Sequence, residues 1–456
     1  SGGSAEAEVD VPSVGPLRVE LNVADTSNPA AQSAKNTSVV ASGISYLDHM
    51  VDQLRSHAML AVGLRTWVCG RLVEPKSNEL KELGADAHLV RLVGSALGSA
   101  LRSCLDAGVA QEAGGAAAKR ASNGGAAAPP RFHFHALLDE ACTEFHLEFP
   151  QDQAIGDGDA KVALSPYGIY PEGGRTFIGS YRVALTEDFF RELARSLRCR
   201  LRAKKIRGDN AHHIVESTFK AFGRSLRKAM DAFCGFDLAA HAVQLAVPRV
   251  AHQQRATKET NISVSLDLDP APGAAPTTIS TGITTFDKLL RELESGSGCS
   301  LSVTCAGDVW IDEHHSVEDV MIAVGKALAT ALGDKGGCTR MSSAESQCGG
   351  ACVLCVMDLS NRPYYCSGLR LDESGEEMIG DLSVEMAEHF FDSLVKNSLM
   401  SCHFLNRSEG DPGAGASASD VAAAAARSFG AALARCYRVD PRYAGAPASS
   451  KGTISK

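Results

Sequence analysis

The fold and the chemistry of this chain are indicated by two stretches of sequence, Gly208–Phe222 (GDNAHHIVESTFKAF) and Ala306–Gly325 (AGDVWIDEHHSVEDVMIAVG). Each has a polar turn with Asn or Asp, then the pattern His-His-x-x-Glu, then apolar residues at helical spacing. One such pattern is weak evidence for a ligand set, because it often marks only the exposed start of a helix. Two copies in equivalent settings predict a pair of related helices that carry the chemistry.

Shorter matches occur in the same order in both halves of the chain. They pair Ser42–Leu54 with Thr281–Leu293, Val93–Leu101 with Val324–Leu332, Glu187–Leu193 with Glu388–Leu394, and Ala221–Leu226 with Ser428–Leu433. The shared order predicts a tandem duplication, with repeats at residues 1–240 and 245–456 and a boundary within Phe236–Val250. The offset between copies shrinks along the chain, so the first repeat is expected to contain insertions, at about 25–41 and 113–130.

Length and composition fit two globular domains of about 200 residues each. The 456 residues carry a net charge of -9 without the basic patch that is typical of nucleic-acid binding. No apolar run approaches a membrane span. The 14 cysteines are scattered, which indicates reduced thiols in an intracellular protein. The first residues have no signal-peptide pattern, so a cytoplasmic protein is expected, or a plastid or other organellar one if a targeting segment has been removed.

Hydrophobic periodicity predicts a sandwich of sheets and helices in each repeat, of the α+β or α/β class. The predicted strands are 17–23, 261–268, 300–304 and 352–359. The predicted amphipathic helices are 44–57, 212–230, 317–332 and 383–397. Each repeat is then strand–helix–strand–helix twice over, with the helices packed on one face of the sheets.

The spacing within each His-His-x-x-Glu motif suits metal ligation. Residues four apart share a helix face, so His212 lies above Glu216 and His314 above Glu318. Adjacent residues diverge by about 100° around the helix, so the paired histidines are better placed to reach two metals than to chelate one. Two such helices facing each other would build two sites, each with one His from either helix and a carboxylate. Ligands of this type without thiolate favour Mn, Fe or Zn, and open positions favour six-coordinate Mn.

The other histidines and cysteines are assigned structural roles. The isolated histidines are His88, His133, His135, His146, His241 and His252. Cys348, Cys352 and Cys355 are spaced like half of a zinc site, but the other half is missing and 351–359 is predicted to be a buried strand.

The set of motifs resembles that of the imidazoleglycerol-phosphate dehydratases. That family carries R-x-T-K-E-T, D-H-M-x-D-Q-L-x-x-H, D-x-H-H-T-x-E-D, D-L-S-G-R-P-Y, a strand ending in L-H, G-x-N-x-H-H-x-x-E-x-x-F-K-A-F and S-S-K-G. The resemblance implies an α+β fold in which each repeat has an internal pseudo-duplication, of the ribosomal protein S5 domain 2-like type. It also implies a carbon–oxygen hydro-lyase of histidine biosynthesis that converts imidazoleglycerol phosphate to imidazole acetol phosphate.

The two repeats have lost different family motifs. The first keeps Asp48-His49-Met50, Gln53, His57, His212, His213, Glu216 and Lys220. It has Leu83, Gly84 and Ala87 at the positions of the other His-His-x-x-Glu, and Arg202 at that of the strand histidine. The second keeps Arg255–Thr260, His314, His315, Glu318, Arg340, Asn361–Tyr364, His403 and Ser449–Gly452. It has Lys288 at the position of His49. Its second His-His-x-x-Glu motif is replaced by Ser419, Asp420 and Ala423, and Arg427 stands where the family has the Lys that follows this motif. Together the repeats supply one full set, which favours a surviving enzyme over random decay.

The resemblance implies roles for these residues. The implied metal ligands are His49, His212, His213, Glu216, His314, His315, Glu318 and His403, which would hold two divalent ions, with Mn favoured, in a site shared by both repeats. The implied acid–base residues are Glu259, Glu216 and Glu318. The implied substrate-binding residues, several of them for the phosphate, are Gln53, His57, Lys220, Arg340, Arg362, Ser450 and Lys451.

The resemblance also implies partners. Family members form octahedral cages of trimers with active sites where subunits meet, so about twelve fused chains in a pseudo-octahedral homo-oligomer would place first repeats beside second repeats. The expected ligand is a phosphorylated imidazole compound, and neither nucleic acid nor a membrane is expected as a partner.

Other functions remain open from the sequence. Three departures from the family motifs favour a catalytically inactive scaffold or assembly protein. Asn361 replaces a family Gly, and Ser297 and Ala58 stand where a Gly usually follows the second helix histidine. Residues 342–350 depart from the usual family sequence P-x-D-E-A. A metal-dependent lyase or hydrolase acting on another phosphorylated small molecule is the next alternative, and a metal-sensing regulator is the third.

Overall fold

The chain divides into two compact units, Ser1–His241 and Ala242–Lys456. The computed structural model describes residues 2–12, 14–27, 38–112, 129–150, 155–241, 247–408, 416–443, 445–446, 448–449 and 454. Most of the two expected insertions, and the predicted site residues Ser450 and Lys451, lie outside the described residues. The divide between the units falls within Phe236–Val250, where the sequence predicts the repeat boundary.

The first unit consists of two modules with the same sheet topology. The first module comprises β1 (Gly2–Val11), β2 (Gly15–Asp25), β3 (Val40–Ala41), α2 (Ser45–Ala58), β4 (Leu60–Val68), β5 (Arg71–Leu72), α3 (Glu79–Glu82) and α4 (Asp86–Glu112). The second comprises β6 (Arg131–Leu138), β7 (Ala141–Glu148), β8 (Ala160–Ala163), β9 (Phe177–Ile178), β10 (Tyr181–Arg182), α5 (Leu185–Leu197), β11 (Arg200–Arg207) and α6 (Ala211–Phe233). The sheet orders are β1-β2-β4-β3 and β6-β7-β11-β8.

The second unit repeats this arrangement. Its first module comprises β12 (Val250–Ala256), β13 (Thr260–Asp267), β14 (Ile279–Ser280), α7 (Thr284–Ser297), β15 (Ser300–Gly307) and α8 (His314–Leu332). Its second comprises β16 (Met341–Cys348), β17 (Ala351–Asp358), β18 (Tyr364–Cys366), β19 (Met378–Ile379), β20 (Leu382–Ser383), α9 (Val384–Ser398), β21 (Ser401–Asn406) and α10 (Ala418–Tyr437). The sheet orders are β12-β13-β15-β14 and β16-β17-β21-β18, so the described chain contains four modules of one topology.

The α+β prediction with an internal pseudo-duplication is confirmed, but the predicted order of elements is incomplete. Every module opens with a β-hairpin and a short parallel strand, which the strand–helix–strand–helix prediction omits. The omitted strands lie at sheet edges. β16, for example, has the mostly polar sequence MSSAESQC, and it is held by its pairing with β17 rather than by an apolar pattern of its own.

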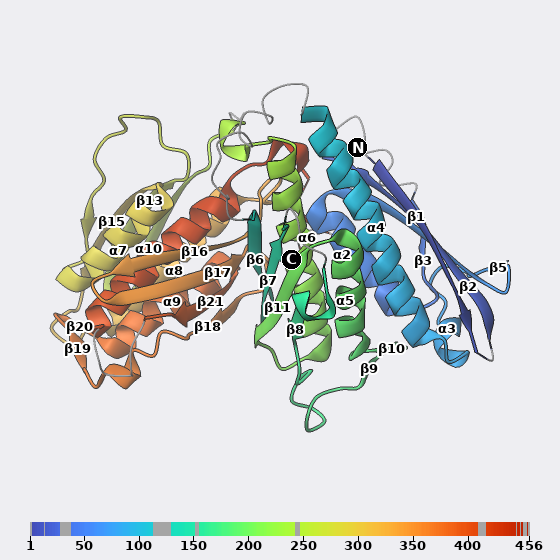
Figure 1. The fold of residues 1–456 in the computed structure, drawn as a ribbon. Helices are drawn as coiled ribbons and strands as arrows, with labels where there is room; N and C mark the ends of the chain where they lie inside the picture. Colours follow the sequence, from blue (N-terminus) through green and yellow to red (C-terminus); the bar gives the residue numbers. More distant parts are fainter. Residues whose placement is uncertain are drawn as a thin grey trace. The chain divides into compact units, whose positions relative to one another are not determined.

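The helices of each unit lie between its two sheets, as the blue-to-green first unit shows most clearly (Figure 1). In the first unit α4 packs on β1 and β2, α6 packs on β6 and β7, and the helices pair as α2 with α6 and α4 with α5. In the second unit the corresponding pairs are α9 with α8 and α7 with α10. Each helix pair therefore joins the first helix of one module to the last helix of the other.

Glycines allow these helix pairs to approach closely. A Cβ at Gly94 of α4 would lie 2.5 Å from the carbonyl oxygen of Phe189 on α5, and a Cβ at Gly325 of α8 would lie 2.7 Å from Cβ of Asn397 on α9. Gly223 of α6 and Gly430 of α10 occupy the corresponding positions. The glycines in the repeated sequence matches therefore mark helix–helix contacts.

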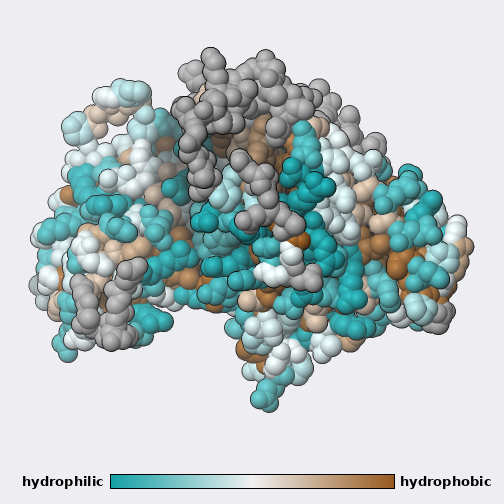
Figure 2. Space-filling view, viewed as in Figure 1, coloured by the Kyte–Doolittle hydropathy of each residue, from teal (hydrophilic) through white to brown (hydrophobic). Residues whose placement is uncertain are grey.

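The surface drawn in the space-filling view is mostly hydrophilic or neutral, with apolar residues in separate patches (Figure 2). Among the described residues, no helix combines the length and the apolar character that crossing a bilayer requires.

Substituting Gly325 with Ala should destabilise the protein by about 1–3 kcal/mol, because the added methyl overpacks the contact between α8 and α9. Helix propensity alone predicts the opposite sign, since Ala is favoured over Gly by about 1 kcal/mol. The free energy of unfolding from urea titration distinguishes the two. Lys326→Ala, on the exposed face of the same helix, is the matched control and should change it by less than about 0.5 kcal/mol.

Candidate metal centre

The first unit brings His49, His212 and Glu216 together where α2 meets α6. Nε2 of His212 lies 3.0 Å and Nε2 of His49 lies 3.3 Å from the same carboxylate oxygen, Oε2 of Glu216. The ligand atoms of the three residues all lie within 4.8 Å of one another. Three of the predicted ligands thus form one cluster, which we call the first half-site.

Local capping sets the position of the histidines at the start of each motif helix. The side chain of Asn210 accepts a hydrogen bond of 2.9 Å from the backbone N–H of His212, so α6 begins at Ala211. The side chain of Asp312 accepts one of 3.0 Å from the N–H of His314 at the start of α8. The polar residue before each His pair therefore fixes both histidines in the first turn of the helix.

Glu216 is held as an anion. Burial by itself would raise its pKa, but the Lys220 ammonium, 2.9 Å from Oε1, and the hydrogen bonds from His212 and His49 outweigh burial and keep the pKa well below its usual range. A carboxylate that stays ionised at every physiological pH suits a metal ligand better than a general acid.

The second unit brings together His314, Glu318 and His389, which we call the second half-site. Oε2 of Glu318 lies 3.8 Å from Nε2 of His314, and Oε1 lies 3.5 Å from Nε2 of His389. The Nε2 atom of His389 is buried and makes no hydrogen bond within the described structure. This cluster is more open than the first, since the Glu318 side chain is 41% exposed and that of Glu216 is 10% exposed. The cluster offers two imidazoles, one of them with an unsatisfied buried nitrogen, and one carboxylate. Ligands of these types fit a divalent cation such as Mn²⁺.

Sequence reasoning missed His389. The signal was available in the pseudo-duplication, because α9 pairs with α8 as α2 pairs with α6. His389 therefore stands to His314 as His49 stands to His212. In the match between Glu187–Leu193 and Glu388–Leu394, the first repeat has Asp188 at the position of His389.

The predicted ligand His403 belongs to neither half-site. It lies on β21 with its side chain fully buried, and its ring centroid is 5.5 Å from that of Tyr364. In the described residues His389, rather than His403, completes the cluster around His314 and Glu318.

The second histidine of each motif is not part of the cluster of its own half-site and contacts a different carboxylate. The ring of His213 is turned by 82° from that of His212, and Nδ1 of His213 lies 2.8 Å from Oε2 of Glu140. The ring of His315 is turned by 78° from that of His314, and its Nδ1 lies 3.0 Å from Oδ2 of Asp308. The hydrogen bond that the His315 ring donates to the Asp308 carboxylate raises the pKa of His315. The divergence that the helical spacing predicts is thus present in both motifs.

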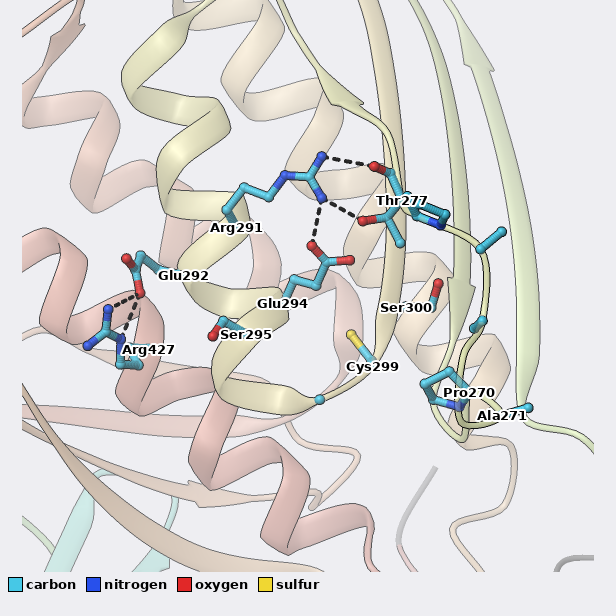
Figure 3. A pocket seen from close by; sticks show the side chains of 14 residues that line it. Pro270, Ala271, Thr277, Arg291, Glu292, Glu294, Ser295, Cys299, Ser300 and Arg427 are labelled. Carbon is cyan, nitrogen blue, oxygen red and sulfur yellow. Dashed lines mark hydrogen bonds and ion pairs between the residues drawn. The ribbon is translucent and has the colours of Figure 1, made fainter.

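The other two helix pairs carry arginine–carboxylate ion pairs. Between α4 and α5, Arg91 donates to Asp188 at 2.7 and 2.9 Å. Between α7 and α10, Arg427 donates to Glu292 at 2.7 Å, beside a pocket of about 650 Å³ (Figure 3). On α7, which also carries Glu292, the side chain of Arg291 contacts Glu294 of the same helix and Thr277 of the preceding loop (Figure 3). The lining of this pocket contains no histidine and none of the predicted site residues. Among the described residues, each unit therefore has one helix pair with a cluster of candidate ligands and one with an arginine–carboxylate ion pair.

Comparison with known proteins identifies the family. The family model described as "Imidazoleglycerol-phosphate dehydratase" matches the chain twice, at residues 42–226 and 281–433. The chain belongs to the imidazoleglycerol-phosphate dehydratase family. This family consists of carbon–oxygen hydro-lyases, and the two matched regions are consistent with a tandem duplication.

Individual relatives match about half of the chain each. The imidazoleglycerol-phosphate dehydratase of Cutibacterium acnes is 37% identical over 215 residues, which are 45% of this chain and 98% of the relative. The Arabidopsis thaliana protein named imidazoleglycerol-phosphate dehydratase 1, chloroplastic, is 34% identical over 218 residues, 48% of this chain and 76% of the relative. The Pyrococcus furiosus enzyme, solved in complex with (S)-C348, is 24% identical with a TM-score of 0.37, covering 44% of this chain and all of that one.

The predicted substrate-binding and acid–base residues are distributed over both units. In the first unit Gln53 and His57 are buried on α2, one and two turns beyond His49, and the Gln53 amide lies 3.5 Å from Nε2 of His49. In the second, Glu259 is exposed in the hairpin turn between β12 and β13, and its carbonyl accepts from the N–H of Asp308 at 3.1 Å.

The predicted phosphate-binding Arg340 is buried in an ion pair. Its guanidinium donates to both oxygens of Asp358, at 2.7 and 3.0 Å, and to the carbonyl of Ala448 at 3.0 Å. The last contact ties Arg340 to the segment that leads into Ser450. The carbonyl of Arg362 accepts from the hydroxyls of Ser360 and Ser401, at 2.9 and 2.8 Å. Asp358 thus already neutralises the charge of Arg340.

Lys335, beside this pair, should make stability depend on pH. Burial lowers its pKa to about 8, although its ammonium donates to Asn361 and to two backbone carbonyls. Between about pH 8 and 10.5 the unfolded chain holds this proton and the folded chain does not, so this group makes stability rise with pH, by about 3 kcal/mol at most. The unfolding free energy of the wild type minus that of Lys335→Met, measured from pH 7 to 10.5, should rise with pH. A difference that does not change with pH would contradict the assignment.

Proposed function

We propose that the protein dehydrates imidazoleglycerol phosphate to imidazole acetol phosphate in histidine biosynthesis, at a di-metal site composed of one half-site from each repeat. The observation that carries this proposal is the complementary loss of ligands. The first half-site uses α2 and α6 and the second uses α8 and α9, whereas the described residues of α4–α5 and α7–α10 form no cluster of candidate ligands. Because the chain has one first half-site and one second half-site, both repeats are needed to assemble the di-metal centre.

The geometry of the paired histidines supports a composite site. Each half-site has three donors, which leaves a divalent ion short of a full coordination shell. Each unit also has one further motif histidine outside its own half-site. We therefore assign His315 to the metal of the first half-site and His213 to that of the second, in agreement with one histidine from either motif helix at each metal.

Exposed apolar residues near both half-sites favour a protein contact there. Trp310, in the loop before His314, is 82% exposed, and Val309 and Ile311 beside it are exposed as well. In the first unit, Ile169 and Tyr170 are exposed, and the N–H of Ile169 donates to the carbonyl of Asp209, just before α6. Exposed apolar groups of this size are typical of interaction surfaces. They are consistent with a large homo-oligomer of about twelve chains in which repeats meet.

The reaction removes one carbon-bound proton and one hydroxyl from neighbouring carbons of the substrate, and the resulting enol becomes the ketone. Two divalent ions, with Mn favoured, would stabilise the imidazole ring as an imidazolate. Glu259 is an exposed carboxylate near His315 and is our candidate for the base that takes the carbon-bound proton. Glu216 is fixed as an anion by Lys220, which assigns it to metal ligation rather than to proton transfer.

The proposal predicts that His389→Ala loses one metal ion per chain. The wild type should bind about two Mn²⁺ per chain, and the variant about one, because the second half-site loses one of its imidazoles. The matched control is Asp188→Asn, which changes the corresponding position of the first repeat, and it should keep about two. Elemental analysis after dialysis measures both. A metal-free wild type would favour the inactive scaffold instead.

His213→Ala and His315→Ala should each abolish most dehydration of imidazoleglycerol phosphate. We expect kcat/KM to fall by at least about 100-fold in each single variant, because each removes a ligand of a different metal. His252→Ala, an exposed strand histidine of the second unit, is the control and should retain activity. Full activity in either motif variant would show that the repeats do not share one site.

A further inference from the structure

Two carboxylates outside the half-sites each hold one histidine of a motif. Oε2 of Glu140, in the turn between β6 and β7, lies 2.8 Å from Nδ1 of His213, and its Oε1 accepts the N–H of Asn210 at 3.1 Å. Asp308, which directly follows β15, contacts Nδ1 of His315 at 3.0 and 3.3 Å. In both rings Nδ1 is occupied, and Nε2 is the nitrogen left for a ligand.

The counterparts of both carboxylates are absent where their histidines are absent. Leu138 pairs with Ala141 and Cys348 with Ala351, so the two turns align and Gly350 occupies the position of Glu140. Asp139 and Gly349, in the same turns, have φ of 51° and 52°, which supports this alignment.

The position in the first repeat that corresponds to Asp308 has no carboxylate either. The parallel pairs Val40–Leu64 and Ile279–Val303 align β4 with β15. The alignment places Cys69 at the position of Asp308. Each carboxylate is therefore present only in the repeat that carries the histidine that it contacts.

We propose that Glu140 and Asp308 are positioning residues that orient His213 and His315 toward the metal of the opposite half-site. This inference rests on the proposed function. A carboxylate on Nδ1 fixes the tautomer with its lone pair on Nε2, limits rotation of the ring and increases its basicity as a ligand. Glu140 also holds the backbone of Asn210, the N-cap of α6, so ring and helix start are oriented by one side chain.

A role in stability alone does not account for this arrangement. The side chains of His213 and His315 are 27% and 43% exposed, and ion pairs of that exposure contribute little to folding. The presence of each carboxylate only in the repeat that carries its histidine is expected if carboxylate and histidine serve one ligand position.

The test measures the affinity of each metal separately in the full chain. In a His389→Ala background only the first half-site retains its metal, and in a His49→Ala background only the second does. Co²⁺ is titrated into the metal-free protein and followed by its visible absorption. Asp308→Asn should weaken Co²⁺ binding about 10- to 100-fold in the His389→Ala background, and Glu140→Gln should do so in the His49→Ala background.

The crossed pattern is the decisive feature. Glu140→Gln in the His389→Ala background and Asp308→Asn in the His49→Ala background should leave Co²⁺ affinity unchanged. Gly350→Glu, at the counterpart of Glu140, is the matched control and should also leave it unchanged. Glu140→Asp should recover part of the lost affinity, and the thermal midpoint of every variant checks its folding.

The outcomes separate this inference from the proposed function. A wild-type chain that binds no Co²⁺ would overturn the proposed function. A wild-type chain that binds two ions, with unchanged affinities in Glu140→Gln and Asp308→Asn, would overturn only the positioning role. If each variant weakened the half-site of its own unit instead, the assignment of His213 and His315 to opposite half-sites would be wrong.

Discussion

The close packing of helix pairs is the constraint on which the rest of the structure depends. Gly223 lets α6 approach α2, and Gly325 lets α8 approach α9. A histidine on one helix can share a carboxylate with a histidine on the next only when the two backbones are this close. The same close contact is used in α4–α5 and α7–α10, where it joins Arg91 to Asp188 and Arg427 to Glu292. The fold thus provides four equivalent positions, and side-chain identity decides what each one does.

Duplication makes this division of labour tolerable. Each unit keeps its own core, and the phenylalanines of α5, α6 and β7 pack against one another with ring centroids 5.0 to 5.6 Å apart in the first unit. The half-site residues of that unit are not among these phenylalanines. An arginine–carboxylate pair between the same helices satisfies the polar groups left at the contact. Complementary loss then follows if only one composite centre per chain is required for function.

Electrostatics gives the two half-sites different characters. Glu216 is buried beside Lys220 and remains an anion, whereas Glu318 is well exposed and has no lysine one turn further along, since Ile322 stands there. The first half-site is therefore the more enclosed of the two, and its carboxylate is the one with a charged partner on the same helix. In contrast, the second histidine of each motif has the same kind of partner in both units, a carboxylate at Nδ1.

The sequence by itself predicted the duplication, the α+β class, the helices that carry both motifs and the residues that cluster as candidate ligands, His389 excepted. The fold class and the helices follow from periodicity, which is a property of single elements, whereas the full candidate ligand set follows from the resemblance of the motifs to the family. It did not determine that His389 joins His314 and Glu318, that His403 lies buried away from them, or that Glu140 and Asp308 contact the second histidines. Those depend on which helix packs against which and on where a turn from another strand ends. Only tertiary structure decides them, because the residues concerned are 70 or more positions apart or lie on different elements whose separation no local pattern encodes.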